Sequence, residues 1–171
     1  AAHGNRVLNY IRSALDEGAQ LVCGGERIAV PGCEGGFFIA PTILANCDNR
    51  MKEVREEIFG PVLAIIKYSD IDEAIAIAND SDYGLSAGIW TVDVVAAQGI
   101  ARRLRAGSVW INDWHQLRAD TPFGGYKQSG QGRENGIAGL ESFLETKAIT
   151  TAFQRDPAKK TMTYGIVHKT A

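Results

Sequence analysis

The chain has 171 residues, of which 45% are hydrophobic and 22% are charged, and this composition excludes disordered and collagen-like proteins. Its formal net charge of -2 gives no electrostatic reason to expect nucleic acid or an anionic membrane as a partner. No apolar run reaches the roughly 20 residues that cross a bilayer, and the first residues lack a signal-peptide pattern. We therefore expect a cytoplasmic globular protein whose partners are small molecules or other subunits.

The first expected helix runs from Asn5 to Gly18, where the glycine is a typical C-terminal stop. Apolar side chains recur along it at helical spacing and predict one buried face: Val7, Tyr10, Ile11 and Ala14. Residues 21–44 then alternate apolar runs with glycine pairs and prolines, which predicts short extended pieces separated by turns. Because the chain begins without a methionine where this helix is already starting, we expect it to be part of a longer protein.

Three later segments have the pattern of buried strands, namely residues 62–68 (VLAIIKY), 86–91 (SAGIWT) and 108–112 (SVWIN). Expected helices lie between them, so the order is strand, helix, strand, helix, strand. Crossovers of this kind are almost always right-handed and join parallel strands. The sequence therefore predicts an α/β fold in which three neighbouring strands form a parallel sheet with covering helices.

Capping residues mark both crossover helices. Asp70 can cap the first helix, and Glu73 completes a D-x-x-E capping box. Its predicted apolar face consists of Ile71, Ala74, Ile75 and Ala78. Asp93 can cap the second helix, and we expect Gly107 to end it. The second apolar face consists of Ala97, Ile100, Ala101 and Leu104.

The last third of the chain begins with a long glycine-rich loop after Asn112. A short helical stretch is expected around residues 140–144. The segment KAITTAF, residues 147–153, has the half-buried alternation of an edge strand or of a strand that joins a partner's sheet. The tail, residues 154–171, shows no clear core pattern.

Three stretches in this order resemble the aldehyde dehydrogenase superfamily: REEIFGPVLAI from Arg55, NDSDYGLSAGIWT from Asn79, and WIN followed by PFGGYKQSGQGRENG from Trp110. The resemblance covers residues 5–153. Such enzymes have a Rossmann-like NAD(P) domain, a catalytic α/β domain and a β extension that pairs subunits. The resemblance therefore implies that residues 1–144 are the C-terminal part of the catalytic domain, residues 145–153 are a C-terminal oligomerisation strand of a homo-oligomer, and residues 154–171 are a tail.

The resemblance also implies which catalytic parts lie elsewhere. The family's nucleophile stands in a G-Q-x-C context and its general base in an E-L-G-G-K stretch, and neither string occurs in this chain. The three cysteines do not resemble the nucleophile's setting, and they form no disulfide or metal-ligand pattern, so we interpret them as reduced thiols: Cys23, Cys33 and Cys47. We therefore expect the chain to be inactive alone and to need the N-terminal part of the same enzyme.

Glu57 and Phe59 lie in the E-I-F-G-P motif, which in the family contacts the nicotinamide half of the cofactor, NAD or NADP. A carboxylate can accept two hydrogen bonds from the cis hydroxyls of a ribose, and an aromatic ring can pack beside the nicotinamide. From composition alone Glu57 would be a solvated carboxylate in the charged run that begins at Glu53, and the motif reverses that interpretation. Glu56 would point to the opposite face of an extended segment, so only one of the two glutamates should reach the ribose.

The loop after Asn112 follows the carboxyl end of a parallel strand, where α/β folds place ligands. The resemblance implies that Phe123 lines the tunnel of the small-molecule aldehyde, and Trp114 or His115 is a further candidate for the tunnel wall. We expect Asn112 to brace the loop by hydrogen bonding. Gly124 and Gly125 are expected to supply a tight turn.

Two more assignments follow from the string YKQSGQGRENG. Glu134 matches a glutamate that some family members use to relay protons, and an exposed or ion-paired carboxylate is the alternative; Arg133 is interpreted as an interface ion-pair partner. The string is similar to bacterial betaine aldehyde dehydrogenases, in which the positions of Lys127 and Gly130 contribute main-chain oxygens to a potassium site. The segment before PFGG departs from those enzymes, and Trp114 is the one clear aromatic for capturing a quaternary ammonium.

Two functional hypotheses remain open. In the first, the complete protein oxidises an aldehyde to a carboxylate: a thiolate attacks the aldehyde, hydride passes to NAD(P)+, and water hydrolyses the thioester. In the second, the chain is a non-catalytic oligomerisation module whose terminal strand extends a neighbour's sheet.

Overall fold

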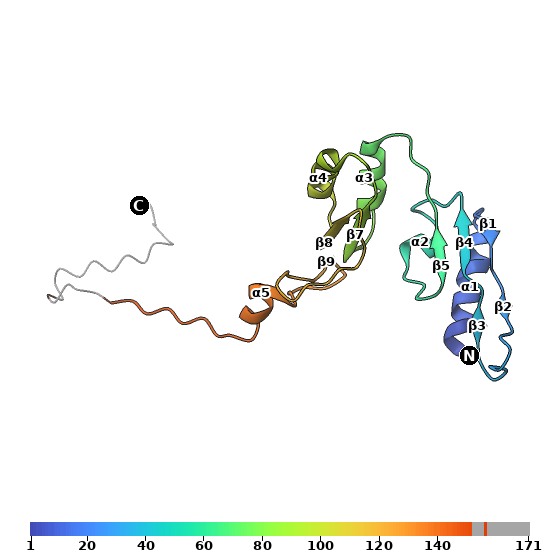
Figure 1. Ribbon diagram of the computed structural model, residues 1–171, viewed down its shortest axis with the longest axis horizontal. Coiled ribbons are helices and arrows are strands. Elements are labelled where there is room, and N and C mark those ends of the chain that lie inside the picture. The colour runs from blue at the N-terminus through green and yellow to red at the C-terminus, as the bar shows by residue number, and fades with distance from the viewer. Residues whose placement is uncertain (152–155, 157–171) are drawn as a thin grey trace, which may run out of the picture.

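The structure, a computed structural model, describes residues 1–151 and residue 156. Figure 1 shows two groups of elements that are joined by an extended link after β5. The N-terminal group contains α1 (Ala2–Asp16), β1 (Gln20–Cys23), β2 (Arg27–Ile28), β3 (Phe38–Ile39), β4 (Thr42–Ala45), α2 (Lys52–Arg55) and β5 (Val62–Ala64). The second group contains α3 (Ile71–Asn79), β6 (Tyr83–Gly84), β7 (Ser86–Ile89), α4 (Val94–Arg103), β8 (Ser108–Ile111), β9 (Tyr126–Lys127) and α5 (Gly136–Glu141).

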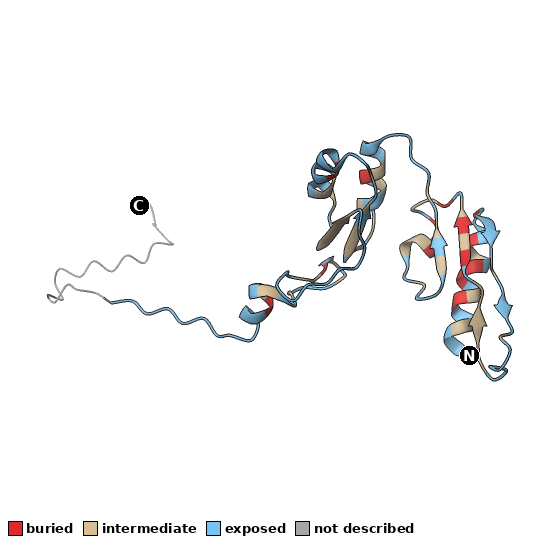
Figure 2. Cartoon of the chain, in the orientation of Figure 1, coloured by how far each residue is buried: buried red, intermediate tan, exposed pale blue. Residues whose placement is uncertain are grey.

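The N-terminal group holds the main hydrophobic core. Its sheet has the order β1-β4-β5, with β1 antiparallel and β5 parallel to β4. The predicted apolar face of α1 is confirmed, because Val7, Tyr10, Ile11 and Ala14 are all buried. Val7, Ile11 and Ala14 form a core with Leu44 of β4 and with residues next to α2, which Figure 2 shows as the main cluster of buried positions.

The turn-rich segment after α1 forms short extended pieces, as predicted. β2 pairs antiparallel with β3, in the register Arg27 with Ile39 and Ile28 with Phe38. The stretch between them makes turns at Pro31–Gly32 and Gly35. Gly24 has a φ of +76°, and a side chain there would collide with the Pro41 carbonyl oxygen at 2.3 Å.

The second group is built around one crossover. β7 and β8 are parallel, and α4 lies between them in sequence. The predicted caps are confirmed: the Asp70 carboxylate accepts from the Glu73 amide at 2.9 Å, and the Asp93 carboxylate accepts from the Ala96 amide at 2.8 Å. β9 pairs antiparallel with β6 and so folds the glycine-rich loop back beside the crossover.

The prediction of three neighbouring parallel strands is wrong for the described residues. β5 ends at Ala64 and pairs with β4, whereas β7 and β8 form a separate sheet. The run 62–68 has the pattern of one strand because it is almost continuously apolar, but only its first half finds a partner strand. Ile65 and Tyr68 stay exposed in the link. The observed class is therefore α/β with small mixed sheets.

Smaller corrections concern helix ends and faces. α4 ends at Arg103, before the predicted stop at Gly107, and α5 begins at Gly136, earlier than the expected helical stretch. On α3 only Ile75 of the predicted apolar face is buried, and Ile71 is 47% exposed. Few elements of this chain cover the second group, so its apolar faces remain open to solvent.

Residues 145–151 take no part in a strand, and Ile149 is 83% exposed. Residues 152–153, which complete the predicted oligomerisation strand, and all of the tail except Asp156 lie outside the described residues. Pairing with a partner's sheet therefore stays a prediction. Across the described residues, no helix combines the length and the apolar character needed to cross a membrane.

Candidate active site

The E-I-F-G-P motif forms the loop between α2 and β5. Glu57 is exposed, and its carboxylate makes no hydrogen bond or ion pair with any described residue. Phe59 is 74% exposed and has a φ of +53°, which is unusual for a residue with a side chain. Glu56 is occupied instead, because its Oε2 accepts from the Tyr10 hydroxyl at 2.5 Å. Both glutamates are exposed, but no described residue bonds to the Glu57 carboxylate, whereas one oxygen of Glu56 is held by Tyr10.

The first turns of α1 hold the main chain of this loop. His3 Nε2 donates to the Phe59 carbonyl at 2.6 Å, and Arg6 Nη2 donates to the Glu57 carbonyl at 3.4 Å. Gly60 lies so close to α1 that a side-chain carbon there would be 2.7 Å from the Val7 side chain. The loop is therefore anchored through its backbone while the Glu57 carboxylate and the Phe59 ring remain accessible.

An aromatic cluster lies at the carboxyl end of the parallel strands β7 and β8. Trp114 packs against Trp110 at 5.3 Å between ring centroids in an edge-to-face arrangement, and against Trp90 at 6.2 Å. His115 is 6.1 Å from Trp110. The sequence singled out Trp114 and His115 but missed Trp90 and Trp110. The sequence did hold a signal for Trp90 and Trp110. Each lies on one of the two expected strands 86–91 and 108–112, which pair in parallel and so bring the two residues to the same end of a sheet.

Asn112 braces the start of this loop, as predicted. Its amide donates to the Thr91 carbonyl at 2.8 Å, and its side-chain oxygen accepts from the Thr91 amide at 2.8 Å. The φ of Asn112 is +55°, a conformation that asparagine tolerates better than most residues. This pair of bonds closes the end of the β7–β8 sheet beneath the tryptophans.

Phe123 and Glu134 are brought together. Their main chains form an isolated antiparallel bridge, with Phe123 N to Glu134 O at 2.8 Å and Glu134 N to Phe123 O at 2.7 Å. Both residues line one hollow of about 400 Å³. Phe123 also faces a second hollow of about 210 Å³, whose other walls include Trp110 and Leu117. The Glu134 side chain is exposed and makes no contact of its own in the described part of the chain.

The interpretation of Arg133 as an interface ion-pair partner stays a prediction, and within the chain Arg133 bonds to main-chain oxygens. Its Nη1 donates to the carbonyls of Gly125 at 3.0 Å and Gly132 at 2.6 Å, and its guanidinium lies 5.5 Å from the Tyr126 ring centroid. Neither Gly124 nor Gly125 has a positive φ; glycine is needed there because a side chain at Gly125 would lie 2.6 Å from Ser129. Close packing of the loop, more than a tight turn, accounts for these glycines.

Lys127 is one of the two residues whose main-chain oxygens are predicted to bind potassium. Its ammonium donates to the carbonyls of Asn79 at 2.7 Å and Ser81 at 2.8 Å, so it ties β9 to the turn after α3. Lys127 has a φ of +52° and Gly130 a φ of +117°, which turns the main chain sharply on either side of Ser129. Among the described residues there is no group of three or more His, Cys, Asp or Glu side chains that could hold a metal. A cation here would therefore depend on main-chain oxygens, as the sequence implied.

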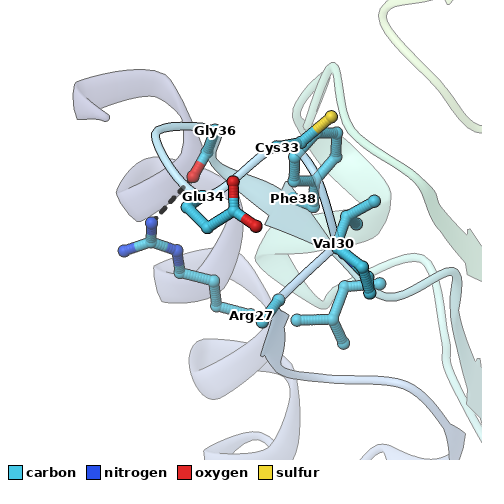
Figure 3. Close-up of a pocket in the computed structure, with 9 residues that line it drawn as sticks. Arg27, Val30, Cys33, Glu34, Gly36 and Phe38 are labelled. Carbon is cyan, nitrogen blue, oxygen red and sulfur yellow. Dashed lines mark hydrogen bonds between the residues drawn. The ribbon is translucent and has the colours of Figure 1, made fainter.

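The three cysteines differ in their exposure. Cys47 is buried, and burial raises the pKa of its thiol, which disfavours the reactive thiolate. Cys23 and Cys33 are exposed. Cys33 lines an open hollow of about 660 Å³ on the β2–β3 hairpin, which contains none of the predicted site residues (Figure 3). Arg27 crosses this hollow and donates to the Gly36 carbonyl at 2.8 Å.

These features define an α/β chain with an exposed carboxylate and aromatic ring on one loop and an aromatic, glycine-rich loop on another. Residues 1–149 match the family model described as "Aldehyde dehydrogenase family". The chain belongs to the aldehyde dehydrogenase family, which confirms the resemblance.

Relatives and solved structures agree with this membership. Over 149 residues the chain is 46% identical to the betaine aldehyde dehydrogenases of Bacillus subtilis (strain 168) and of Brucella melitensis biotype 2, covering 87% of this chain in each case. It spans only 30% and 31% of the length of these curated relatives.

The matching solved structures include several complexes with NAD+. The betaine aldehyde dehydrogenase of Staphylococcus aureus in complex with NAD+ is 44% identical with a TM-score of 0.82, covering 86% of this chain and 29% of that one. The aldehyde dehydrogenase of Mycobacterium tuberculosis complexed with NAD+ is 51% identical with a TM-score of 0.78, covering 83% of this chain and 29% of that one.

Proposed function

We propose that this chain supplies part of the cofactor and aldehyde sites of an NAD+-dependent aldehyde dehydrogenase that oxidises an aldehyde to a carboxylate. The observation that carries the proposal is the E-I-F-G-P loop, where the Glu57 carboxylate and the Phe59 ring are both exposed on an anchored backbone. The remaining catalytic groups, including a cysteine nucleophile, would come from an N-terminal part of the same enzyme. The chain alone would then be inactive.

The loop fits the nicotinamide half of NAD+. The free Glu57 carboxylate offers two acceptor oxygens, which match the two cis hydroxyls of a ribose. The exposed Phe59 ring can pack against the flat nicotinamide and restrict its orientation. NAD+ supplies a hydride acceptor when it is bound. The loop residues contribute binding and orientation, and Glu56 does not compete for the ribose because Tyr10 holds it.

The second loop fits the aldehyde side. Phe123 offers an apolar wall beside Trp110 and Leu117, and Trp114 extends the aromatic surface. Glu134 pairs through its main chain with Phe123 and lines the neighbouring hollow of about 400 Å³. Its carboxylate has no hydrogen-bond partner among the described residues, so it is suited to accept a proton from water in that hollow. Betaine aldehyde and other cationic aldehydes would gain from the aromatic cluster through cation–π attraction. Main-chain oxygens of Lys127 and Gly130 would hold potassium as a structural ion.

The test of this proposal is Glu57→Gln in the enzyme that contains this chain. The amide keeps the size of the side chain but removes one strong acceptor, so we expect the KM for NAD+ to rise and kcat/KM to fall by about ten- to a hundredfold. The matched control is Glu26→Gln, a second exposed glutamate whose side chain makes no contact in the described residues. Unchanged kinetics in Glu57→Gln would remove Glu57 from the cofactor site.

The oligomerisation hypothesis keeps a specific observation in its favour. Apolar side chains near the end of the described chain have no cover, with Phe143 88% and Ile149 83% exposed. We propose that residues 145–153 add a strand to a neighbouring subunit in a homo-oligomer. Removal of these residues should reduce the assembly mass measured by light scattering. An unchanged mass would contradict this role.

A further inference from the structure

One face of α1 makes a ladder of polar contacts to the E-I-F-G-P loop. His3 bonds to the Phe59 carbonyl, Arg6 bonds to the Glu57 carbonyl, and Tyr10 bonds to the Glu56 carboxylate. Arg6 Nη2 also donates to the Tyr10 hydroxyl at 3.4 Å, which links the second and third contacts. Three positions of one helix therefore hold three positions of the loop.

The spacing of these residues explains why they act together. Positions three and four apart share one side of a helix, so the side chains of residues 3, 6 and 10 lie one above another. The neighbouring face of α1 carries Val7, Ile11 and Ala14 and packs into the core. The ladder is thus placed on a rigid, buried scaffold. It leaves the Glu57 carboxylate and the Phe59 ring free.

The contacts also select a conformation of the loop. Phe59 has a left-handed backbone, which costs free energy in a residue with a side chain and persists only where surrounding contacts hold it. The His3 bond acts on the carbonyl of that residue, and the packing of Gly60 against Val7 fixes the next position. Immediately before the motif, the Tyr10 hydroxyl directs the Glu56 side chain towards α1. The next side chain, Glu57, then points towards solvent.

We propose that His3, Arg6 and Tyr10 are positioning residues that preset the E-I-F-G-P loop for the nicotinamide half of NAD+, an inference that rests on the proposed function. They act through the loop and do not themselves touch the reacting atoms. Tyr10 makes the strongest of the three contacts. Its bond to Glu56 is charge-assisted and short, and such bonds are about twice as strong as neutral ones.

Tyr10→Phe tests the proposal in the enzyme that contains this chain. The substitution keeps the buried ring, which is 8% exposed, and removes only the hydroxyl. We expect the KM for NAD+ to rise about three- to tenfold, while the KM for the aldehyde stays unchanged. Tyr68→Phe is the matched control, because Tyr68 is exposed and its hydroxyl bonds to no described residue. A merely structural role would lower the thermal midpoint and change both KM values alike, and that result would overturn the proposal.

A second measurement reads the loop directly. Amide hydrogen exchange of residues 56–60 should be about three- to tenfold faster in Tyr10→Phe than in the wild type, and unchanged in Tyr68→Phe. Because Tyr10 acts through Glu56, the double variant Tyr10→Phe with Glu56→Gln should raise the KM for NAD+ no further than either single variant. Additive effects of the two substitutions on the KM for NAD+ would overturn the proposal. Loop exchange in Tyr10→Phe at the wild-type rate would also overturn it.

Glu57→Gln separates this inference from the proposed function. If Glu57→Gln impairs NAD+ binding but Tyr10→Phe changes neither the KM for NAD+ nor loop exchange, the ladder is refuted and the cofactor site stands. If Glu57→Gln has no effect on NAD+ kinetics, the proposed function fails. In that case faster loop exchange in Tyr10→Phe would still show that Tyr10 restrains the loop. The role of Tyr10 in cofactor binding would nevertheless be refuted together with the proposed cofactor site.

Discussion

Glu53 gives the sharpest prediction about stability. It lies on α2, it is only 4% exposed, and neither of its carboxylate oxygens has a hydrogen-bond partner among the described residues. Burial raises the pKa of this carboxyl above its ordinary value of 4.5, and the nearby charges of Glu17 and Asp48 raise it further. The buried site therefore disfavours the charged form of this carboxyl.

The magnitude follows from the missing partners. A buried polar group without a hydrogen bond costs about 1–3 kcal/mol, and a charged group costs more. We expect Glu53→Met, which removes the charge and both unsatisfied oxygens, to raise the free energy of unfolding at pH 8 by about 1–3 kcal/mol. Glu53→Gln should give a smaller gain, because its neutral amide remains without partners. Glu26→Gln, at an exposed glutamate, should change little.

The dependence on pH has a definite sign. Because the folded-state pKa of Glu53 is raised, the folded state binds more protons than the unfolded state at pH values above 4.5. Its contribution to stability is complete below that value and is lost as the pH rises through the folded-state pKa. Urea unfolding at pH 5 and pH 8 should show a smaller difference between wild type and Glu53→Met at pH 5. Equal differences at both pH values, or a Met variant less stable than wild type, would refute the reasoning.

Two further predictions concern backbone constraints. Asp70→Ala should lower the free energy of unfolding by about 1 kcal/mol in urea titrations because it removes the α3 cap, whereas Asp70→Asn, which keeps an acceptor, should lose less. Gly107→Ala should cost about 1–3 kcal/mol or more because the new carbon would lie 1.6 Å from the Gly124 carbonyl oxygen. Gly99→Ala in α4 meets nothing within 4 Å and should instead stabilise the helix by about 0.5–1 kcal/mol. Thermal unfolding of the two alanine variants should therefore shift in opposite directions, and shifts in the same direction would contradict the packing argument.

Local patterns in the sequence predicted local structure well. The buried face of α1 follows from the spacing of its apolar residues. The caps of α3 and α4 follow from Asp70 and Asp93, each of which precedes its helix and accepts a hydrogen bond from the amide three residues later. Strand partners were harder, because pairing depends on contacts far apart in the chain. The run 62–68 is apolar except for Lys67, so nothing near Ala64 indicates that the ladder ends there or that its partner is β4.

The candidate site shows the same division. The E-I-F-G-P motif singles out Glu57 and Phe59, whereas composition alone predicts that the charged run beginning at Glu53 is solvated. In the fold this run splits, with Glu53 buried against the core, Glu56 bonded to Tyr10 and Glu57 exposed. These three environments depend on how α1 packs against α2. The residue pattern of a short helix does not indicate that packing. For the same reason the tryptophan cluster needed the β7–β8 pairing before Trp90 and Trp110 could be placed beside Trp114.

We propose that this chain works only as part of a larger NAD+-dependent aldehyde dehydrogenase. NADH formation from NAD+ and an aldehyde should be compared between the purified 171-residue chain and a protein that also includes the residues encoded upstream of Ala1. We expect that the chain alone forms no NADH, and that the longer protein contains a G-Q-x-C segment and forms NADH. NADH formation by the chain alone, or an upstream start codon with no such segment, would contradict it.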